Sequence, residues 1–346
     1  LPCRKLSSLT VRNSSGRTVR HCSLSYDVVR HPVMSNKGVT LLKSVSIDGE
    51  GTSAFSYYGN GADAIDGTTE FPSMTTPSVD WLGFYNPSVS ASGFAPGIAS
   101  VRSSGVSSCL LNHRQPDLCG TRLGMLRSIS YPTGGSATYE YELNSYSEDI
   151  TGLNPSSVCT PASGLRVKAI TMRERDGSLV QRKEYRYESG SGSGVSSGRL
   201  LRRPSLYVRY RLQTIGFKIL ERECVSTVSD LFYGASLHLE YPRVLEVISG
   251  EGPDELCTVE YCFTASDSNG LRNCYGPASA GYDGEEGDGN VRDFSMEHLS
   301  STDNIFALFN SMKDSEPFLG GGRLLSRREY KGPALETNLV REISYS

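Results

Sequence analysis

The fold is decided by the stretch Met125-Leu126-Arg127-Ser128-Ile129-Ser130-Tyr131-Pro132-Thr133-Gly134-Gly135-Ser136-Ala137-Thr138-Tyr139-Glu140-Tyr141-Glu142. In its second half Ala137, Tyr139 and Tyr141 share one face, and Thr138, Glu140 and Glu142 take the other. This period of two is typical of a β-strand with one packed side. Pro132 fixes φ at the start of the turn, and Gly134-Gly135 can adopt the positive φ of a tight connection. The stretch therefore predicts a β-hairpin.

The same pattern recurs along the chain. A strand that mixes aliphatic and basic residues leads into a turn that contains glycine, and a second, alternating strand ends on aromatic residues. Asp176-Gly177 is among the strongest hairpin turns of this kind. The predicted hairpin units lie near residues 4–26, 42–58, 125–142, 165–187, 244–263 and 324–345. Their irregular spacing argues against a strict propeller or solenoid.

These units predict an all-β fold in which repeated hairpins coil into one continuous curved sheet. We expect residues 1–346 to form a single β-repeat region of a larger protein, because the chain opens without Met and ends in a strand-like run. The Ser-, Gly- and Pro-rich or polar stretches predict flexible insertions at 86–120, 188–198 and 265–290. One short helix is predicted near 302–313, where apolar residues fall at i, i+3, i+4 and i+7.

Charge and hydropathy exclude several classes of partner. The formal net charge of −3 is too close to neutral to indicate nucleic acid or an anionic membrane. The sequence has no run of about 18 apolar residues, so we expect no membrane insertion by this segment. The 36 glycines predict frequent turns and few helices.

The cysteines give no metal motif. They are Cys3, Cys22, Cys109, Cys119, Cys159, Cys224, Cys257, Cys262 and Cys274. None forms Cys-x-x-Cys, which argues against a zinc site of ordinary spacing. Cys109 and Cys119 flank a loop and are candidates for a disulfide. The alternative is that most of these residues are small, buried and apolar.

Two of the units resemble a known family. Gly124 to Gly135 with the following Tyr139-Glu140-Tyr141-Glu142, and Gly164 to Ile170 with Asp176-Gly177 and Tyr185-Arg186-Tyr187, are similar to large Rhs-like (YD-repeat) proteins of Bacteroides-type bacteria. Asp80-Trp81-Leu82-Gly83-Phe84-Tyr85-Asn86 is similar to another recurrent stretch of that family. The nearest likeness spans about residues 122–200, and looser likeness extends over most of the chain.

The resemblance implies a β-hairpin shell and a bacterial setting, at the cell surface or secreted. It also implies partners, namely the rest of the same polypeptide and, in some members, an enclosed C-terminal cargo. The strict Tyr-Asp-x-x-Gly-Arg repeat is absent here, and only its tail is kept in Gly198-Arg199-Leu200 and Gly322-Arg323-Leu324. The self-cleaving aspartate motif of many Rhs shells is also missing. The sequence therefore leaves both a closed shell wall and an open β module as alternatives.

No catalytic constellation emerges from the sequence. The histidines show no i, i+4 pair; they are His21, His31, His113, His238 and His298. The Gly/Ser run near Gly192 lacks the strand-turn-helix setting of a nucleophile elbow. Glu140 and Glu142 would stand about 7 Å apart on one strand face, near the spacing of inverting glycosidases. Because they alternate with tyrosines, a solvated outer face explains them better. We therefore predict a non-enzymatic chain without a cofactor.

Two weaker sites complete the predictions. The acidic loop offers Asp283, Glu285, Asp288 and Asp293 as hard oxygen ligands for calcium, although the spacing does not match a calcium loop and a solvated loop is the simpler interpretation. Trp81, Phe84 and Tyr85 form the densest aromatic cluster, which suits either the core or a sugar-binding surface. Three functional hypotheses follow, in this order: a structural β-repeat module, a carbohydrate- or protein-binding surface module, and a glycan-active enzyme.

Overall fold

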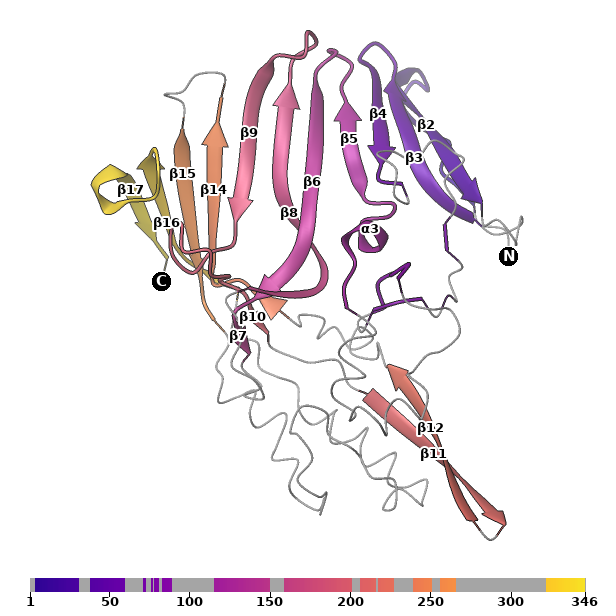
Figure 1. The fold of residues 1–346 in the computed structure, drawn as a ribbon. Helices are drawn as coiled ribbons and strands as arrows, with labels where there is room; N and C mark the ends of the chain where they lie inside the picture. The colour runs from indigo at the N-terminus through magenta and orange to yellow at the C-terminus, as the bar shows by residue number, and fades with distance from the viewer. Residues whose placement is uncertain are drawn as a thin grey trace.

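The structure is a computed structural model. It describes residues 4–30, 38–59, 71–72, 76, 78–80, 83–88, 115–149, 159–200, 206–215, 217–226, 239–250, 256–265 and 322–345. Most of the described strands form one twisted antiparallel sheet, and its strands follow one another in chain order (Figure 1). The order across this twelve-stranded sheet is β1-β2-β3-β4-β5-β6-β8-β9-β14-β15-β16-β17.

The sheet is a series of hairpins. Its strands are β1 (Ser8–Arg12), β2 (Thr18–Arg30), β3 (Gly38–Ile47), β4 (Gly51–Tyr57), β5 (Leu126–Ser130), β6 (Ser136–Tyr146), β8 (Thr160–Arg173), β9 (Leu179–Arg186), β14 (Arg243–Ser249), β15 (Cys257–Phe263), β16 (Leu324–Lys331) and β17 (Leu339–Ser344). Each predicted hairpin unit coincides with one consecutive pair of these strands, although β2, β3, β6 and β8 extend a few residues beyond the predicted bounds. The prediction of an all-β fold with repeated hairpins in one continuous sheet is confirmed. Within the described residues β1 and β17 pair on one side only, so the sheet is open.

The short turns lie at one end of the sheet, and the strand ends from which the long connections leave lie at the other (Figure 1). Three of the turns have the same geometry, in which the fourth residue is a glycine with positive φ: Gly16 at 79°, Gly134 at 93° and Gly177 at 89°. In each turn the glycine N–H donates to the carbonyl three residues earlier, from Gly134 to Tyr131 for example. Glycine occupies this position because L side chains are strained there.

Four hairpins carry the same tyrosine contact, which we call the tyrosine clasp. A tyrosine late in the second strand or just beyond it donates its hydroxyl proton to a main-chain carbonyl on, or just before, the first strand. The clasps join Tyr26 to Leu6 at 2.8 Å, Tyr57 to Leu42 at 2.7 Å, Tyr141 to Leu126 at 2.9 Å and Tyr187 to Val167 at 2.8 Å. The first three tyrosines each follow a break in strand register directly. These hairpins therefore repeat the same tyrosine contact as well as the same sequence pattern.

The two faces of the N-terminal half differ in chemistry. Opposite residues on neighbouring strands share a face. On one face hydroxyl groups bond across the strands, as Ser25 to Ser44 at 2.6 Å and Ser56 to Ser128 at 2.6 Å. The other face carries aliphatic and aromatic side chains; it includes Leu24, Val45, Ile47, Phe55, Ile129, Ala137 and Tyr139. The alternation predicted for residues 137–142 is observed.

A compact cluster lies below the lower end of β6. A small three-stranded sheet forms there from β13 (Leu239–Glu240), β10 (Arg199–Leu200) and β7 (Glu148–Asp149) (Figure 1). Its apolar centre consists of Ala162, Leu200 and Leu239, against which Tyr146 and Tyr241 pack. Arg199 reaches Glu148 at 2.8 Å and Glu240 at 2.7 Å, so one guanidinium joins the two outer strands.

The remaining elements are short or separate. The four-residue helix α3 (Leu118–Thr121) was not predicted and is capped by the Asp117 side chain. The 3-10 turn η3 (Glu336–Asn338) lies between β16 and β17, and β11 (Leu206–Ile215) pairs with β12 (Phe217–Ser226) in a hairpin of their own. The predicted helix at 302–313 lies outside the described residues. No helix in the described part of the chain is long and apolar enough to cross a membrane.

Candidate functional site

The predicted aromatic site is described in part. Trp81 lies outside the described residues, whereas Phe84 and Tyr85 belong to a tight turn. Phe84 is 38% exposed, and its ring lies near Gly164 on β8. Tyr85 is half-buried and bridges to Val79. These two rings are therefore neither fully buried nor gathered in one open surface, and the ligand-binding prediction stays a prediction.

Asp80 organises this turn from the inside. It is fully buried. Its side chain accepts the Phe84 N–H at 3.0 Å, and its own N–H donates to the Phe84 carbonyl at 2.8 Å. Gly83 permits the reversal with a φ of 90°. The turn then packs close to α3, because a side chain on Gly120 would collide with the Tyr85 carbonyl. Asp80 and residues 83–86 thus belong to a turn held by a buried carboxylate.

The other predicted sites have different outcomes. The acidic calcium candidates Asp283, Glu285, Asp288 and Asp293 lie outside the described residues, and the described residues contain no cluster of metal-ligating side chains. Cys119 carries a free thiol, so the disulfide considered with Cys109, which itself lies outside the described residues, is not present. Of the histidines only His21 is described, and it bonds Thr10 at 2.9 Å.

Glu140 and Glu142 do lie on one face of β6, and each bonds an arginine. Arg182 donates to Glu140 at 2.6 Å, and Arg166 donates to Glu142 at 2.7 Å. The hydrogen bond from Arg182 outweighs partial burial and lowers the pKa of Glu140. A general acid in a glycosidase needs a raised pKa, so this shift runs in the wrong direction for that role. The arrangement favours cross-strand pairing.

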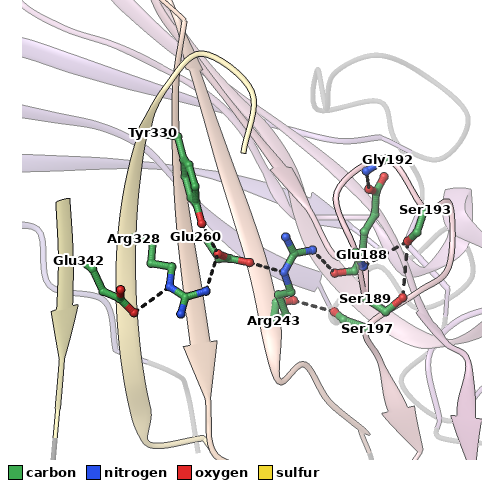
Figure 2. Close-up of polar contacts among 11 residues, drawn as sticks. Glu188, Ser189, Gly192, Ser193, Ser197, Arg243, Glu260, Arg328, Tyr330 and Glu342 are labelled. Carbon is green, nitrogen blue, oxygen red and sulfur yellow. Dashed lines mark hydrogen bonds and ion pairs between the residues drawn. The ribbon is translucent and has the colours of Figure 1, made fainter. Parts of the chain in front are cut away.

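A connected set of polar contacts lies on β14 to β17 (Figure 2). At its centre Glu260 accepts hydrogen bonds from Arg243 and from the Tyr330 hydroxyl, the latter at 2.7 Å. Arg328 approaches the same carboxylate at 3.9 Å and donates to Glu342 at 2.8 Å. The Glu260 side chain is only 8% exposed. We call these five residues the Glu260 network.

Burial alone would raise the pKa of Glu260, but the hydrogen bonds from Tyr330 and Arg243 and the charges of Arg243 and Arg328 outweigh it and lower the pKa. Burial and the hydrogen bond to Glu260 raise the pKa of Tyr330 to about 12. Both shifts keep the carboxylate ionised and the phenol protonated near neutral pH. The network therefore joins four strands, β14 to β17, through paired charges and hydrogen bonds.

The Glu260 network continues into the Ser/Gly segment 188–198 (Figure 2). Arg243 donates to the Glu188 carbonyl at 2.8 Å, and the Ser197 hydroxyl donates to the Arg243 carbonyl at 2.6 Å. Within the segment the Gly192 N–H bonds the Glu188 side chain at 2.8 Å. Composition predicts a flexible loop here, yet the segment follows a hydrogen-bonded path, and Ser196 and Ser197 are buried. Its serines are partners of β6 and β14.

A second buried carboxylate lies on the opposite face of β14. Glu246 accepts from Lys183 at 2.9 Å, from Tyr261 at 3.0 Å and from Tyr185 at 3.2 Å. Burial, the Glu246 charge and the hydrogen bond to it raise the pKa of Tyr185 to about 12. Side chains from β9, β14 and β15 thus meet at one carboxylate. Polar contacts on both faces of the sheet therefore join β14 to β15.

An arginine of β8 also contacts two neighbouring tyrosine rings, whose centres lie 4.9 Å apart. The Arg166 guanidinium lies 4.3 Å from the centre of the Tyr187 ring and 5.1 Å from that of Tyr241. Tyr241 in turn accepts the Ser145 N–H at 3.0 Å and bonds Asn144 at 3.2 Å. These contacts join β6 and β8 to the segment before β14, where the chain returns from the insertion between β9 and β14.

Sequence reasoning missed the importance of Glu246 and Glu260. The alternation of β14 and β15 places each of them on a sheet face, but their basic and phenolic partners come from strands that are distant in sequence. A usable signal was the presence of Glu together with Arg or Tyr in each of the strands β14 to β17. The chain matches no protein-family model, no curated protein and no solved structure. The Rhs-like resemblance therefore stays a prediction.

Proposed function

We propose that this chain is a non-catalytic structural β-repeat segment, a piece of wall in a large Rhs-like bacterial protein that is secreted or displayed at the cell surface. The observation that carries the proposal is the single sheet whose twelve strands follow one another in chain order. Such a sheet grows by adding hairpins, as a wall does, and each added hairpin contacts mainly its neighbours.

The placement of the connections supports the same role. Five longer connections leave the sheet at the end opposite the hairpin turns, and the sheet continues after each of them (Figure 1). After the connection from β9 to β14, for example, the strands pair in register over five residues, from Leu245 with Arg186 to Ser249 with Arg182. The long connections at this end of the sheet therefore do not interrupt the pairing of its strands.

Polar contacts between neighbouring strands compensate for the small apolar core of this sheet. Few apolar side chains of the described residues are fully buried. The Glu260 network, the Glu246 cluster and the tyrosine clasps each join neighbouring strands through buried or half-buried polar contacts. Hydrogen bonds to charged groups contribute about 1.5–3 kcal/mol each, more than neutral ones. We infer that carboxylates that join strands in this way stabilise the sheet and take no part in catalysis.

Limited proteolysis of the full-length protein, mapped by mass spectrometry, tests the proposal. If this chain is a wall around other parts of the polypeptide, those parts stay protected while the connections at the lower rim are cut first. As a matched control, the isolated chain is digested under the same conditions, and the strands of its large sheet should stay intact while the connections between them are cut. Free digestion of every other part of the polypeptide while this chain survives alone would contradict the wall and favour an independent module.

The same proposal predicts what the wall encloses or contacts. In the Rhs-like family the wall encloses a C-terminal cargo in some members, and others are adhesive surface proteins. A protected C-terminal fragment in the proteolysis experiment supports enclosure. A glycan array tests the adhesive alternative, which predicts binding that depends on the exposed ring of Phe84.

A further inference from the structure

Two turns of the large sheet contain the same dipeptide in different settings. Asp48-Gly49 lies between β3 and β4, and Asp176-Gly177 lies between β8 and β9; the other Asp-Gly and Asn-Gly pairs lie outside the described residues. Both aspartates are exposed, both glycines have positive φ, and a side chain on either glycine would meet nothing within 4 Å. A glycine nitrogen can attack the preceding aspartate easily, because glycine has no Cβ to hinder the approach. The two turns can therefore be compared directly.

At Asp176-Gly177 both reacting groups are hydrogen-bonded. The Gly177 N–H donates to the Glu174 carbonyl at 3.1 Å. The Asp176 carboxylate accepts the Ser178 hydroxyl at 2.6 Å and the Ser178 N–H at 2.9 Å. These two bonds, that of the hydroxyl first, lower the pKa of Asp176, so its carboxyl is seldom in the protonated form that an amide nitrogen attacks. Attack in this turn therefore requires that several hydrogen bonds break first.

At Asp48-Gly49 neither reacting group is held in this way. The turn is closed by the Glu50 N–H, which donates to the Ile47 carbonyl at 3.0 Å, and the Gly49 N–H takes no part in it. Among the described residues the Asp48 carboxylate and the Gly49 N–H have no hydrogen-bond partner. The nitrogen and the carboxyl carbon belong to adjacent residues, so rotation about the bonds of Asp48 is enough to bring them together.

We propose that Asp48-Gly49 is a modification site at which the chain slowly forms isoaspartate, and that this change loosens the β3–β4 hairpin. The Gly49 nitrogen attacks the carboxyl carbon of Asp48, an N–C bond forms, and the carboxyl OH leaves with the amide proton as water. Water then opens the resulting succinimide ring at the main-chain carbonyl, so that the main chain continues through the Asp48 side chain. The net change is an isomerisation, which needs no oxidant, metal or second substrate.

The modified turn is part of a closely packed end of the sheet. A Cβ on Gly51 would lie 2.8 Å from the Cβ of Pro132, so the β3–β4 turn packs directly on the β5–β6 turn. Glu50 of the same turn pairs with Arg20 of β2. Isoaspartate adds one carbon to the main chain of the turn, and a longer turn displaces both contacts. The loosening therefore follows from the packing of the turn and does not depend on the wall proposal.

Peptide mapping of the aged protein tests the proposal. The complete 346-residue chain is incubated for weeks near neutral pH, digested, and analysed by mass spectrometry with electron-transfer fragmentation, which distinguishes isoaspartate from aspartate. Methyl transfer from labelled S-adenosylmethionine by a purified L-isoaspartyl methyltransferase gives an independent count. We expect Asp48 to convert about tenfold faster than Asp176 or more, because the hydrogen bonds at Asp176-Gly177 add to the barrier.

Two variants test the cause of the difference. Asp48→Glu keeps the charge of an exposed residue but needs a larger ring for the same attack, so the peptide that carries it should no longer accept methyl groups. Ser178→Ala removes the hydroxyl that holds Asp176, and conversion at Asp176 should become severalfold faster while conversion at Asp48 stays the same. Both substitutions lie in exposed turns, and an unchanged urea midpoint confirms that each variant is folded.

Three results would overturn the proposal. The first is equal conversion at Asp48 and Asp176. The second is no conversion at Asp48 in the time in which a synthetic peptide of residues 46–51 converts. The third is an unchanged rate at Asp176 in Ser178→Ala, which would show that these hydrogen bonds do not control the reaction. For the loosening, the isoaspartate form is separated by chromatography, and its β3 and β4 amides should exchange faster than those of the unmodified chain; equal exchange would contradict it.

Discussion

At Gly198 the main chain passes so close to the Ser145 carbonyl that a single added carbon has no room. A Cβ at this position would overlap Ser145 and also meet the Tyr241 ring. Gly198→Ala should therefore lower the free energy of unfolding by about 1–3 kcal/mol, the range for overpacking a filled site. Gly190→Ala is the matched control, because its added carbon would make only ordinary contact with Ser193. Equal urea midpoints for the two variants would refute the close packing.

Glu260 is the residue whose charge the sheet most depends on. Glu260→Gln keeps the shape but leaves Arg243 without its carboxylate partner and Arg328 with Glu342 alone, and breaking a buried pair in this way costs about 3 kcal/mol. Urea unfolding at neutral pH measures the loss. The control Glu174→Gln changes an exposed turn residue and should have little effect.

The pH dependence gives a second readout of Glu260. Its pKa is lower in the folded state than the ordinary value of 4.5, so the folded state binds fewer protons than the unfolded state. The stabilisation is thus present above pH 4.5 and is lost as pH falls below it. The stabilities of the wild type and Glu260→Gln should converge in acid. A constant gap between them at all pH values would show that the charge of Glu260 is not the cause.

At the scale of the hairpin, the tyrosine clasp makes a prediction with an internal control. Tyr141→Phe removes the hydroxyl that bonds the Leu126 carbonyl and keeps the ring, which packs edge-on against Tyr58. The lost hydrogen bond should cost about 1 kcal/mol. Tyr139→Phe, two residues earlier on the same face, should cost less, because no clasp is assigned to Tyr139. Equal losses in denaturant unfolding would contradict the clasp.

The hairpins themselves could be predicted because their determinants are local. Alternation in residues 137–142 and glycine at positions such as Gly134 and Gly177 act over a few residues, and the structure has strands and positive φ where the pattern placed them. The clasps were not predicted. Their tyrosines were recognised as strand-end residues, but a hydroxyl and a carbonyl 15 or 20 residues apart meet only once the hairpin has formed.

The candidate site was less predictable for the same physical reason. Ser/Gly composition indicates a flexible loop in segment 188–198, whereas Ser197 bonds Arg243 and Ser196 bonds Ser145, both distant in sequence. In the sequence Glu260 is an ordinary strand residue, because its partner Tyr330 lies on the distant strand β16. Two polar partners that are separated by an insertion form no local sequence pattern, so they can be recognised only in the folded sheet.

At the scale of the whole molecule, the continuity of the sheet decides whether the chain is one wall or two separate β modules. The pairing of β9 with β14 spans the long insertion between them and joins the two halves. In one continuous sheet both strands are interior, whereas in two separate sheets each would be an edge. Interior strands have main-chain hydrogen bonds on both sides and exchange their amide protons slowly.

Amide hydrogen exchange of the native chain, resolved by mass spectrometry, therefore tests the central claim most directly. The account predicts that β9 and β14 are protected as strongly as β6 and β8, and that β1 and β17 exchange fastest among the strands of the large sheet. If β9 and β14 instead exchange as fast as β1 and β17, the sheet is divided at the insertion, and the chain is not one continuous wall.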